Sequence, residues 1–151
     1  MKAFLLAAGE GTRLKPYTDT VPKCLMPING KPLLEIWINL LESHGITDVL
    51  VNTHHQAEKV ESFVKHIKSQ AKVTITTVYE PRLLGSAGTV AAQRDFIIDN
   101  DDFIIAYADN LTNINLSNMI EFHRGCRIRG GGGLLWDYLE HRILDLVVSL
   151  F

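Results

Sequence analysis

The chain opens with an uninterrupted apolar run, residues 3–8 (AFLLAA), which stops at Gly9. A strand that is covered on one face alternates apolar and polar residues, whereas a strand covered on both faces, as in a parallel sheet, is apolar throughout. The run therefore predicts a buried strand of a parallel sheet. With 151 residues, of which 46% are hydrophobic, the chain is long enough for one such domain and short for two.

Strand and helix patterns alternate along the rest of the chain. Apolar residues recur at spacings of three and four between residues 33 and 41, which predicts a helix that ends at Gly45. The following patterns predict a strand over Asp48–Thr53, a helix over about 56–69, a strand over 72–79, a loop over 80–89 leading into a helix that ends near Ile97, a strand over 102–108 and a helix over 116–123. This order predicts an α/β fold with a Rossmann-like, doubly wound, mostly parallel sheet, whose ligands bind at the carboxyl ends of the strands.

A basic loop follows the first strand. Residues 2–31 carry five basic residues against Glu10 and Asp19, a local charge of +3 in a chain of net charge −2. Glycines let backbone N–H groups approach phosphate oxygens, and cationic side chains neutralise the phosphate charge. We therefore interpret residues 9–31, called the basic loop below, as a binding site for a small polyanion.

The glycine pair of the basic loop does not match two familiar nucleotide motifs. A dinucleotide fingerprint needs a third glycine where this chain has Leu14, and an acidic residue after the second strand, which ends instead in Asn52 and Thr53. The P-loop pattern, with its Gly-Lys-Ser/Thr ending, is not matched either. An ordinary tight turn would not need the cations that follow Gly11, so we favour a cradle for a nucleoside triphosphate.

Two further features surround this cradle. Asp109 comes just after the strand over 102–108, where a carboxylate can hold Mg²⁺ between phosphate oxygens, although an Asp-Asn pair is also common in turns. The loop over 80–89 fits two interpretations: its backbone lies against a planar base, with Glu80 as an acceptor at the edge of the base, or Gly85 and Gly88 simply permit a tight loop and close helix packing. We expect Gly85 or Ser86 to cap the helix that follows.

Composition limits the partners and the compartment. A net charge of −2 and a pI near 6.3 argue against a nucleic-acid partner. Cys24 and Cys126 form neither a disulfide framework nor a metal-ligand pair, which favours the cytoplasm, and we interpret Cys24 as a neutral packing thiol. The apolar runs are too short for a signal peptide or a membrane-spanning helix, so we expect no membrane partner. A homo-oligomer is compatible with the sequence.

In combination, these motifs resemble those of the sugar-phosphate nucleotidylyltransferases. The resemblance rests on residues 6–14 (LAAGEGTRL), 22–27 (PKCLMP), 31–32 (KP), 80–81 (EP) and 84–89 (LGSAGT) together with Asp109, and it covers about residues 1–124. The LGSAG form looks most like the mannose-1-phosphate guanylyltransferase branch. The resemblance implies a transferase of nucleotide-sugar biosynthesis that makes a nucleotide sugar and pyrophosphate from a nucleoside triphosphate, GTP in this branch, and a sugar 1-phosphate, here mannose 1-phosphate.

The resemblance also implies roles for single residues. Arg13 would steady the leaving pyrophosphate, Lys23 would contact the α-phosphate or the sugar phosphate, and Asp109 would bind the cofactor Mg²⁺. The implied nucleotide-binding residues are Leu6, Ala8, Gly9, Gly11, Thr12, Arg13, Glu80, Gly85 and Gly88. An attacking phosphate is already anionic and needs no general base, so catalysis would rest on alignment and on cations near the developing charge.

The end of the chain departs from the resemblance. In this family the chain normally continues with further strands, a lysine for the sugar phosphate and a second metal-binding aspartate, and none of these is found after Gly125. We therefore expect a truncated sheet, with a nucleotidyltransferase core over residues 1–124 and an atypical glycine-rich and apolar segment over residues 125–151. Residues 134–151 fit either a helix, with Trp136, Leu139, Ile143, Val147 and Leu150 on one face, or a strand over 146–151.

Two other functions stay open from the sequence. One is a truncated, non-catalytic fragment that binds a nucleotide. The other is an enzyme like the phosphocholine cytidylyltransferases, which use a similar loop.

Overall fold

The computed structural model describes residues 1–98, 102–128 and 142–146. Its strands are β1 (Lys2–Leu6), β2 (Pro27–Ile28), β3 (Lys31–Pro32), β4 (Asp48–Thr53), β5 (Thr74–Tyr79), β6 (Asp102–Tyr107) and β7 (Arg142–Leu146). Its α-helices are α1 (Leu33–Ser43), α2 (Ala57–Ile67), α3 (Gly85–Ala92) and α4 (Leu116–Ile128), and short 3₁₀ turns lie at Thr12–Leu14, Tyr17–Asp19, Lys23–Leu25 and Arg94–Phe96.

The main sheet has the strand order β5-β4-β1-β6-β7, and all of its neighbouring strands run parallel. The prediction of a doubly wound parallel sheet is thus confirmed. The strand order reverses between β1 and β6, and in such sheets ligands bind at the carboxyl ends of the strands at this switch point. The N–H of Ala108 donates to the carbonyl of Leu6 at 2.9 Å, which holds the two connections together where they leave the sheet.

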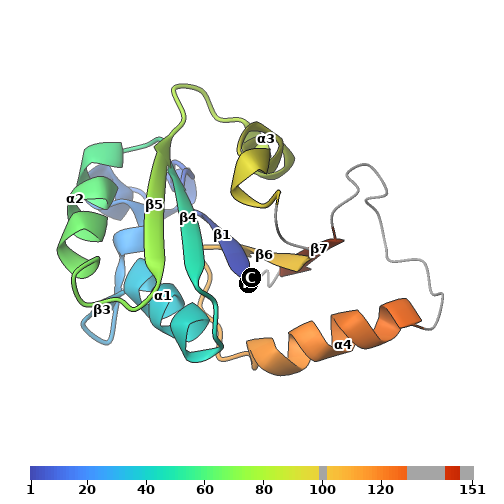
Figure 1. The fold of residues 1–151 in the computed structure, drawn as a ribbon. Coiled ribbons are helices and arrows are strands. Elements are labelled where there is room, and N and C mark those ends of the chain that lie inside the picture. The colour runs from blue at the N-terminus through green and yellow to red at the C-terminus, as the bar shows by residue number, and fades with distance from the viewer. Residues whose placement is uncertain (99–101, 129–141, 147–151) are drawn as a thin grey trace.

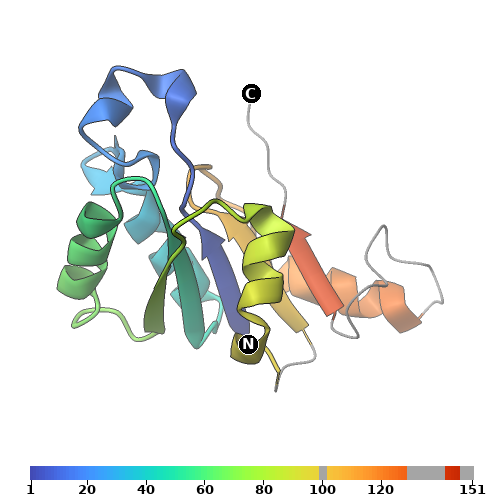
Figure 2. The same cartoon turned by 90° about the horizontal axis from the view of Figure 1, so that it is seen from above.

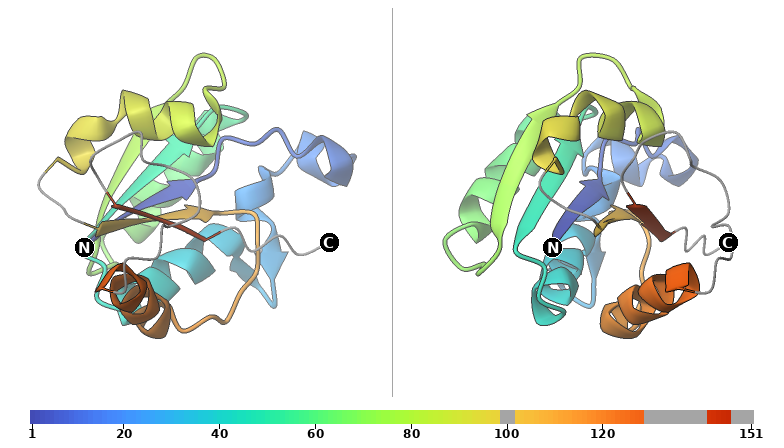
Figure 3. Two further views of the ribbon diagram at one scale, coloured as in Figure 1. Left: turned by 90° about the vertical axis from the view of Figure 1, so that its right-hand side faces the viewer. Right: turned by 45° about the vertical axis from the view of Figure 1, so that its right-hand side comes forward.

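Helices cover both faces of the sheet (Figures 1 and 3). The helices α1, α2 and α4 pack on one face, where their buried side chains form one cluster with alternate residues of the strands; it includes Leu34, Trp37, Val60, Val64, Leu116 and Ile120. The helix α3 packs on the opposite face, where Val90 and Ile97 join Phe4, Leu50, Phe103 and Ile105. Burial on both faces explains why β1, β4 and β6 contain continuous apolar runs.

Two local predictions were wrong by small amounts. The helix α3 begins at Gly85, with Leu84 as its N-cap, so neither Gly85 nor Ser86 caps it. The basic loop also contains a small antiparallel hairpin, β2–β3, where the sequence pattern predicts only loop. Its turn is Asn29-Gly30, with φ angles of +49° and +81°, the type of pair that favours a two-residue hairpin turn.

The end of the chain agrees only in part with the predicted elements. The helix α4 runs to Ile128, across the predicted boundary after residue 124, and that boundary stays a prediction. The strand β7 pairs in parallel with β6, so residues 142–146 form a strand and not part of the predicted helix. Trp136, Leu139, Val147 and Leu150 lie outside the described residues. Within the described part of the chain, no helix is long and apolar enough to span a membrane.

Candidate functional site

The basic loop leaves the carboxyl end of β1 and extends beyond the sheet before it returns to α1 (Figure 2). Its first turn is set by Gly11, which has a φ angle of +65°, a conformation that favours glycine. A Cβ atom at Gly11 would also come within 2.8 Å of Thr18 Cγ2. The Thr18 hydroxyl donates to the Gly11 carbonyl at 2.8 Å, so the loop folds back on itself. Thr12 and Arg13 lie exposed on the 3₁₀ turn after Gly11.

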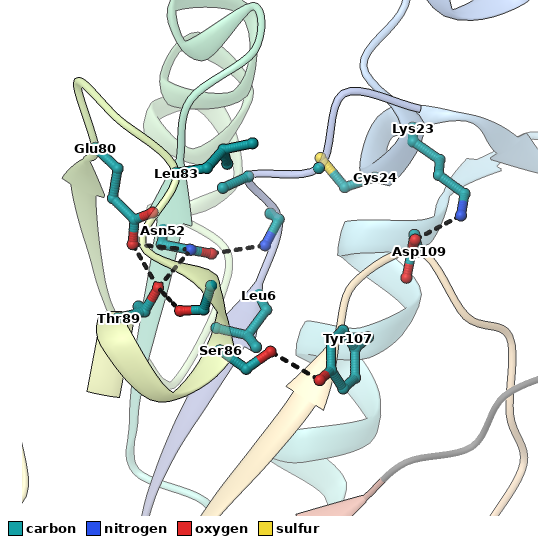
Figure 4. A pocket seen from close by; sticks show the side chains of 14 residues that line it. Leu6, Lys23, Cys24, Asn52, Glu80, Leu83, Ser86, Thr89, Tyr107 and Asp109 are labelled. Atoms are coloured by element: carbon teal, nitrogen blue, oxygen red, sulfur yellow. Dashed lines mark hydrogen bonds and ion pairs between the residues drawn. The ribbon is translucent and has the colours of Figure 1, made fainter. Parts of the chain in front are cut away.

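A cavity of about 230 Å³ lies beside this loop at the switch point between β1 and β6. Figure 4 shows its lining, with Glu80, Asn52 and Thr89 on one side and Lys23 and Asp109 on the other. The full lining is Leu6, Ala7, Ala8, Gly9, Lys23, Cys24, Asn52, Glu80, Leu83, Gly85, Ser86, Thr89, Tyr107 and Asp109. Small-molecule sites typically measure about 300–1,000 Å³, so this cavity suits part of a nucleotide, with the remainder over the basic loop.

Lys23 and Asp109 form an ion pair at one side of the cavity. Lys23 Nζ lies 2.5 Å from Asp109 Oδ2, and the two side chains are 23% and 32% exposed. Lys23 begins a 3₁₀ turn of the basic loop. The connection that carries Asp109 is held by α1, because the indole Nε1 of Trp37 donates to the carbonyl of Asn110 at 2.7 Å. The pair therefore joins two connections that leave adjacent strands.

Glu80 is the centre of a buried polar cluster on the opposite side. Glu80 is only 4% exposed, and its Oε1 accepts hydrogen bonds from Asn52 Nδ2 at 3.1 Å and from Thr89 Oγ1 at 2.5 Å. Oε2 accepts from the N–H of Leu84 at 3.3 Å, while Asn52 Oδ1 accepts from the N–H of Ala7 at 2.8 Å. These bonds tie β4 to the loops that follow β1 and β5. A carboxylate can accept about four hydrogen bonds, and Glu80 accepts the three given above. About one acceptor position therefore remains for a ligand.

The first turn of α3 and the end of β6 meet at the cavity, where Ser86 and Tyr107 are part of the lining. The hydroxyl groups of Ser86 and Tyr107 lie 2.8 Å apart and connect α3 to β6 (Figure 4). Gly85 has a φ angle of +71°, and a Cβ atom at Gly88 would lie 2.9 Å from Leu84 Cβ. Close packing therefore accounts for glycine at position 88.

Cys24 lies in the wall of the cavity and is 2% exposed. Burial raises the pKa of its thiol to about 12, and the nearby negative charge of Asp109 acts in the same direction. A thiol with this pKa is protonated and unreactive at neutral pH. The arrangement agrees with the interpretation of Cys24 as a packing residue.

The structure brings together many of the residues singled out from the sequence. Those that line the cavity are Leu6, Ala8, Gly9, Lys23, Glu80, Gly85 and Asp109; those outside its lining are Gly11, Thr12, Arg13 and Gly88. Sequence reasoning missed Asn52, Ser86, Thr89 and Tyr107. A polar residue at the carboxyl end of an apolar strand, as at Asn52 and Tyr107, was the available signal, because such positions face the ligand edge of a parallel sheet.

Comparison with known proteins agrees with this architecture. Residues 2–131 match the family model described as nucleotidyl transferase. The chain is 36% identical over 134 residues to a UTP–glucose-1-phosphate uridylyltransferase of Synechocystis sp., covering 82% of this chain and 34% of that protein. It is 33% identical over 126 residues to a mannose-1-phosphate guanylyltransferase of Arabidopsis thaliana, covering 82% of this chain and 35% of that protein.

Among solved structures, HddC from Yersinia pseudotuberculosis has a similar fold. It superimposes with a TM-score of 0.71 at 24% identity, covering 80% of this chain and 53% of HddC. The chain thus spans about a third of the length of the two curated relatives and about half of this structure.

Proposed function

The chain belongs to the nucleotidyl transferase family, and on this premise we propose that it transfers the nucleotidyl group of a nucleoside triphosphate to a sugar 1-phosphate, releasing pyrophosphate. The observation that carries the proposal is the Lys23–Asp109 pair, which lies beside a glycine-containing basic loop at the switch point of the sheet. It puts a cation and a candidate metal ligand next to a cavity suited to part of a nucleotide.

We propose GTP and mannose 1-phosphate as the substrates. The guanylyltransferase named above and the LGSAG sequence over residues 84–88 support this choice. The competing pair is UTP and glucose 1-phosphate, which the name of the Synechocystis relative supports. We further propose that the reaction takes place in the cytoplasm, where the free thiol of Cys24 would stay reduced.

We propose that the nucleotide spans the cavity and the basic loop. The base would lie against Leu6, Ala8, Gly85 and Gly88, with the remaining acceptor position of Glu80 at its edge. The phosphates would lie along the backbone of Gly9, Gly11 and Thr12, where backbone N–H groups could approach them at a turn that glycine permits. Arg13 is exposed at the end of this turn, where its guanidinium would neutralise the leaving pyrophosphate.

Asp109 fits one ligand position of a magnesium ion. Mg²⁺ at phosphate sites is usually held by one or two carboxylates together with substrate oxygens and water. The described residues contain no cluster of three or more His, Cys, Asp and Glu side chains that could hold a metal ion, so Asp109 would share the ion with the triphosphate. When bound, Mg²⁺ would neutralise charge on the phosphate oxygens.

Lys23 and Asp109 neutralise each other in their ion pair. A triphosphate with its metal ion offers each side chain a new partner of opposite charge, so we propose that Lys23 moves from Asp109 to the α-phosphate or the sugar phosphate. The attacking sugar phosphate is anionic and needs no base. The contribution of the protein is therefore to align two anions and to place cations where charge develops.

Pyrophosphate release tests the proposal. The chain is incubated with Mg²⁺ and one of three substrate pairs: GTP with mannose 1-phosphate, UTP with glucose 1-phosphate, or CTP with choline phosphate. Triphosphate binding is measured in parallel by calorimetry. We expect release with the GTP pair. Release with the UTP pair alone would overturn the choice of substrates, and release only with CTP and choline phosphate would identify a cytidylyltransferase instead.

Matched variants test the residues. Asp109→Asn and Lys23→Met are expected to lower turnover about 10²–10³-fold, the effect of removing one electrostatic group from a transition state. Lys68→Met is the control, because Lys68 is exposed at the C-terminal end of α2. Equal loss in all three variants would contradict the assigned roles.

A second candidate function is nucleotide binding without turnover. The chain spans about a third of the length of the two curated relatives, so binding and turnover have to be measured separately. Binding of GTP with no pyrophosphate release under any substrate pair would support it. A chain that binds no triphosphate would refute both candidates.

A further inference from the structure

We propose that Gln56 is a positioning residue for the first part of the basic loop, residues 9–15, and that it acts through Thr18. The inference rests on the proposed function, because it assumes that this part of the loop holds the triphosphate. Gln56 immediately precedes α2 and lies outside the lining of the cavity. Its effect on the ligand would therefore be indirect.

A continuous series of hydrogen bonds connects Gln56 to the glycine turn. Gln56 Nε2 donates to the carbonyl of Thr18 at 2.8 Å, and the hydroxyl of Thr18 donates to the carbonyl of Gly11 at 2.8 Å. Thr18 is 1% exposed, whereas its neighbours Tyr17 and Asp19 are exposed. Thr18 is thus the point at which this part of the loop is anchored.

The side chain of Gln56 is itself held in one orientation. Lys59 Nζ donates to Gln56 Oε1 at 2.8 Å and also to the carbonyl of Thr20 at 2.5 Å. This contact fixes the amide so that its nitrogen faces Thr18, with His55 Nε2 at 2.9 Å on the same nitrogen. Gln56 has a φ angle of +51°, uncommon for a residue other than glycine, and its side chain does not cap α2. Its amide nitrogen bonds to the loop at Thr18, and its amide oxygen is held by Lys59 of α2.

Anchoring of the loop should strengthen the binding of the phosphates. Residues 12–17 are exposed, and an unanchored loop would lose conformational entropy when it closes around phosphates. A loop that is already ordered avoids much of this loss and binds more tightly. The residues proposed to contact the base come from the end of β1, from α3 and from the loop that carries Glu80, so contacts to the base should not depend on Gln56.

The test compares two nucleotides that share a base. Dissociation constants for GTP and GMP, each with Mg²⁺, are measured by calorimetry for the full chain and for Gln56→Met and Thr18→Val. Both substitutions keep the size of the side chain and remove its hydrogen bonds. We expect GTP to bind about tenfold more weakly, the loss expected for one hydrogen bond, and GMP to change less than about twofold.

Two further variants and a second readout complete the test. Thr18→Ser keeps the hydroxyl and should restore most of the affinity lost in Thr18→Val, whereas Gln70→Met, at an exposed glutamine after α2, should change neither constant. Cleavage by trypsin after Arg13 reports the order of the loop without any ligand. It should accelerate in Gln56→Met and Thr18→Val and stay unchanged in Gln70→Met.

The outcomes separate the two proposals. Equal weakening of GTP and GMP, or unchanged GTP affinity, would overturn the positioning role of Gln56, as would unchanged cleavage after Arg13. If the unsubstituted chain bound neither nucleotide, the proposed function would fail. The trypsin comparison would then decide by itself whether Gln56 anchors the loop.

Discussion

Replacing Asn52 with leucine should destabilise the protein strongly, although the two side chains have similar volumes. Asn52 is 4% exposed, and its carboxamide joins Ala7, Glu80 and Thr89 through three hydrogen bonds. Leucine can make none of these bonds. It would leave the N–H of Ala7 without a partner and would remove one donor from the buried carboxylate of Glu80.

The expected magnitude follows from these two losses. An unsatisfied buried N–H group costs about 1–3 kcal/mol, and a hydrogen bond to a charged group contributes about 1.5–3 kcal/mol. We therefore expect Asn52→Leu to lower the free energy of unfolding by about 3–5 kcal/mol, a large part of the total of about 5–15 kcal/mol for a typical domain.

Urea unfolding followed by circular dichroism measures this change. The midpoint should fall with little change in the slope, because the surface exposed on unfolding stays similar. Asn113→Leu is the matched control, because Asn113 is exposed, and its effect should stay within about 0.5 kcal/mol. A loss below about 1 kcal/mol in Asn52→Leu would refute the view that this cluster ties the cavity wall together.

Three further perturbations test other parts of the structure. Gly11→Ala should lower stability by about 1–2 kcal/mol in thermal unfolding, because Gly11 has a positive φ angle and an added Cβ would lie very close to Thr18. Gly9→Ala is the control and should leave stability unchanged, because no atom lies within 4 Å of its added Cβ. Equal effects of the two substitutions would contradict this explanation. Burial raises the pKa of Cys24 from 9.0 to about 12, so its contribution to stability is fully present below pH 9 and is lost as the pH rises toward 12, since the unfolded chain ionises first. Between pH 8 and pH 10.5 the unsubstituted protein should therefore lose more stability than Cys24→Ala, and parallel losses would argue against a buried thiol. Trp37→Phe should cost about 1–2 kcal/mol, because Trp37 is 2% exposed and its indole bonds to the β6–α4 connection; an unchanged urea midpoint would show that this bond is not needed.

The regular elements could be predicted because their signals are local. The apolar run of β1, the spacing of three and four in α1 and the glycine after it each reflect burial or backbone geometry within a few residues. Element ends were less certain, since the start of α3 depends on where its first turn packs. The small hairpin β2–β3 was missed although Asn29-Gly30 is a recognisable turn signal.

The candidate site was predicted in part. Lys23 and Asp109 were singled out separately, and their meeting follows only because β1 and β6 are neighbours, although 86 residues separate them in the chain. The role of Asn52 was not foreseen. An asparagine at a strand end indicates the ligand edge of the sheet, but it does not indicate that its side chain contacts a buried carboxylate.

The sequence by itself determined the alternation of strands and helices, the parallel sheet and the edge at which a ligand would bind, because these depend on hydrophobic periodicity and on the position of loops. Only the tertiary structure decided which polar side chains meet there. Hydrogen bonds and ion pairs such as Gln56–Thr18 and Lys23–Asp109 act over about 3 Å, and distances of that size between residues far apart in the chain are set by the packing of the whole domain.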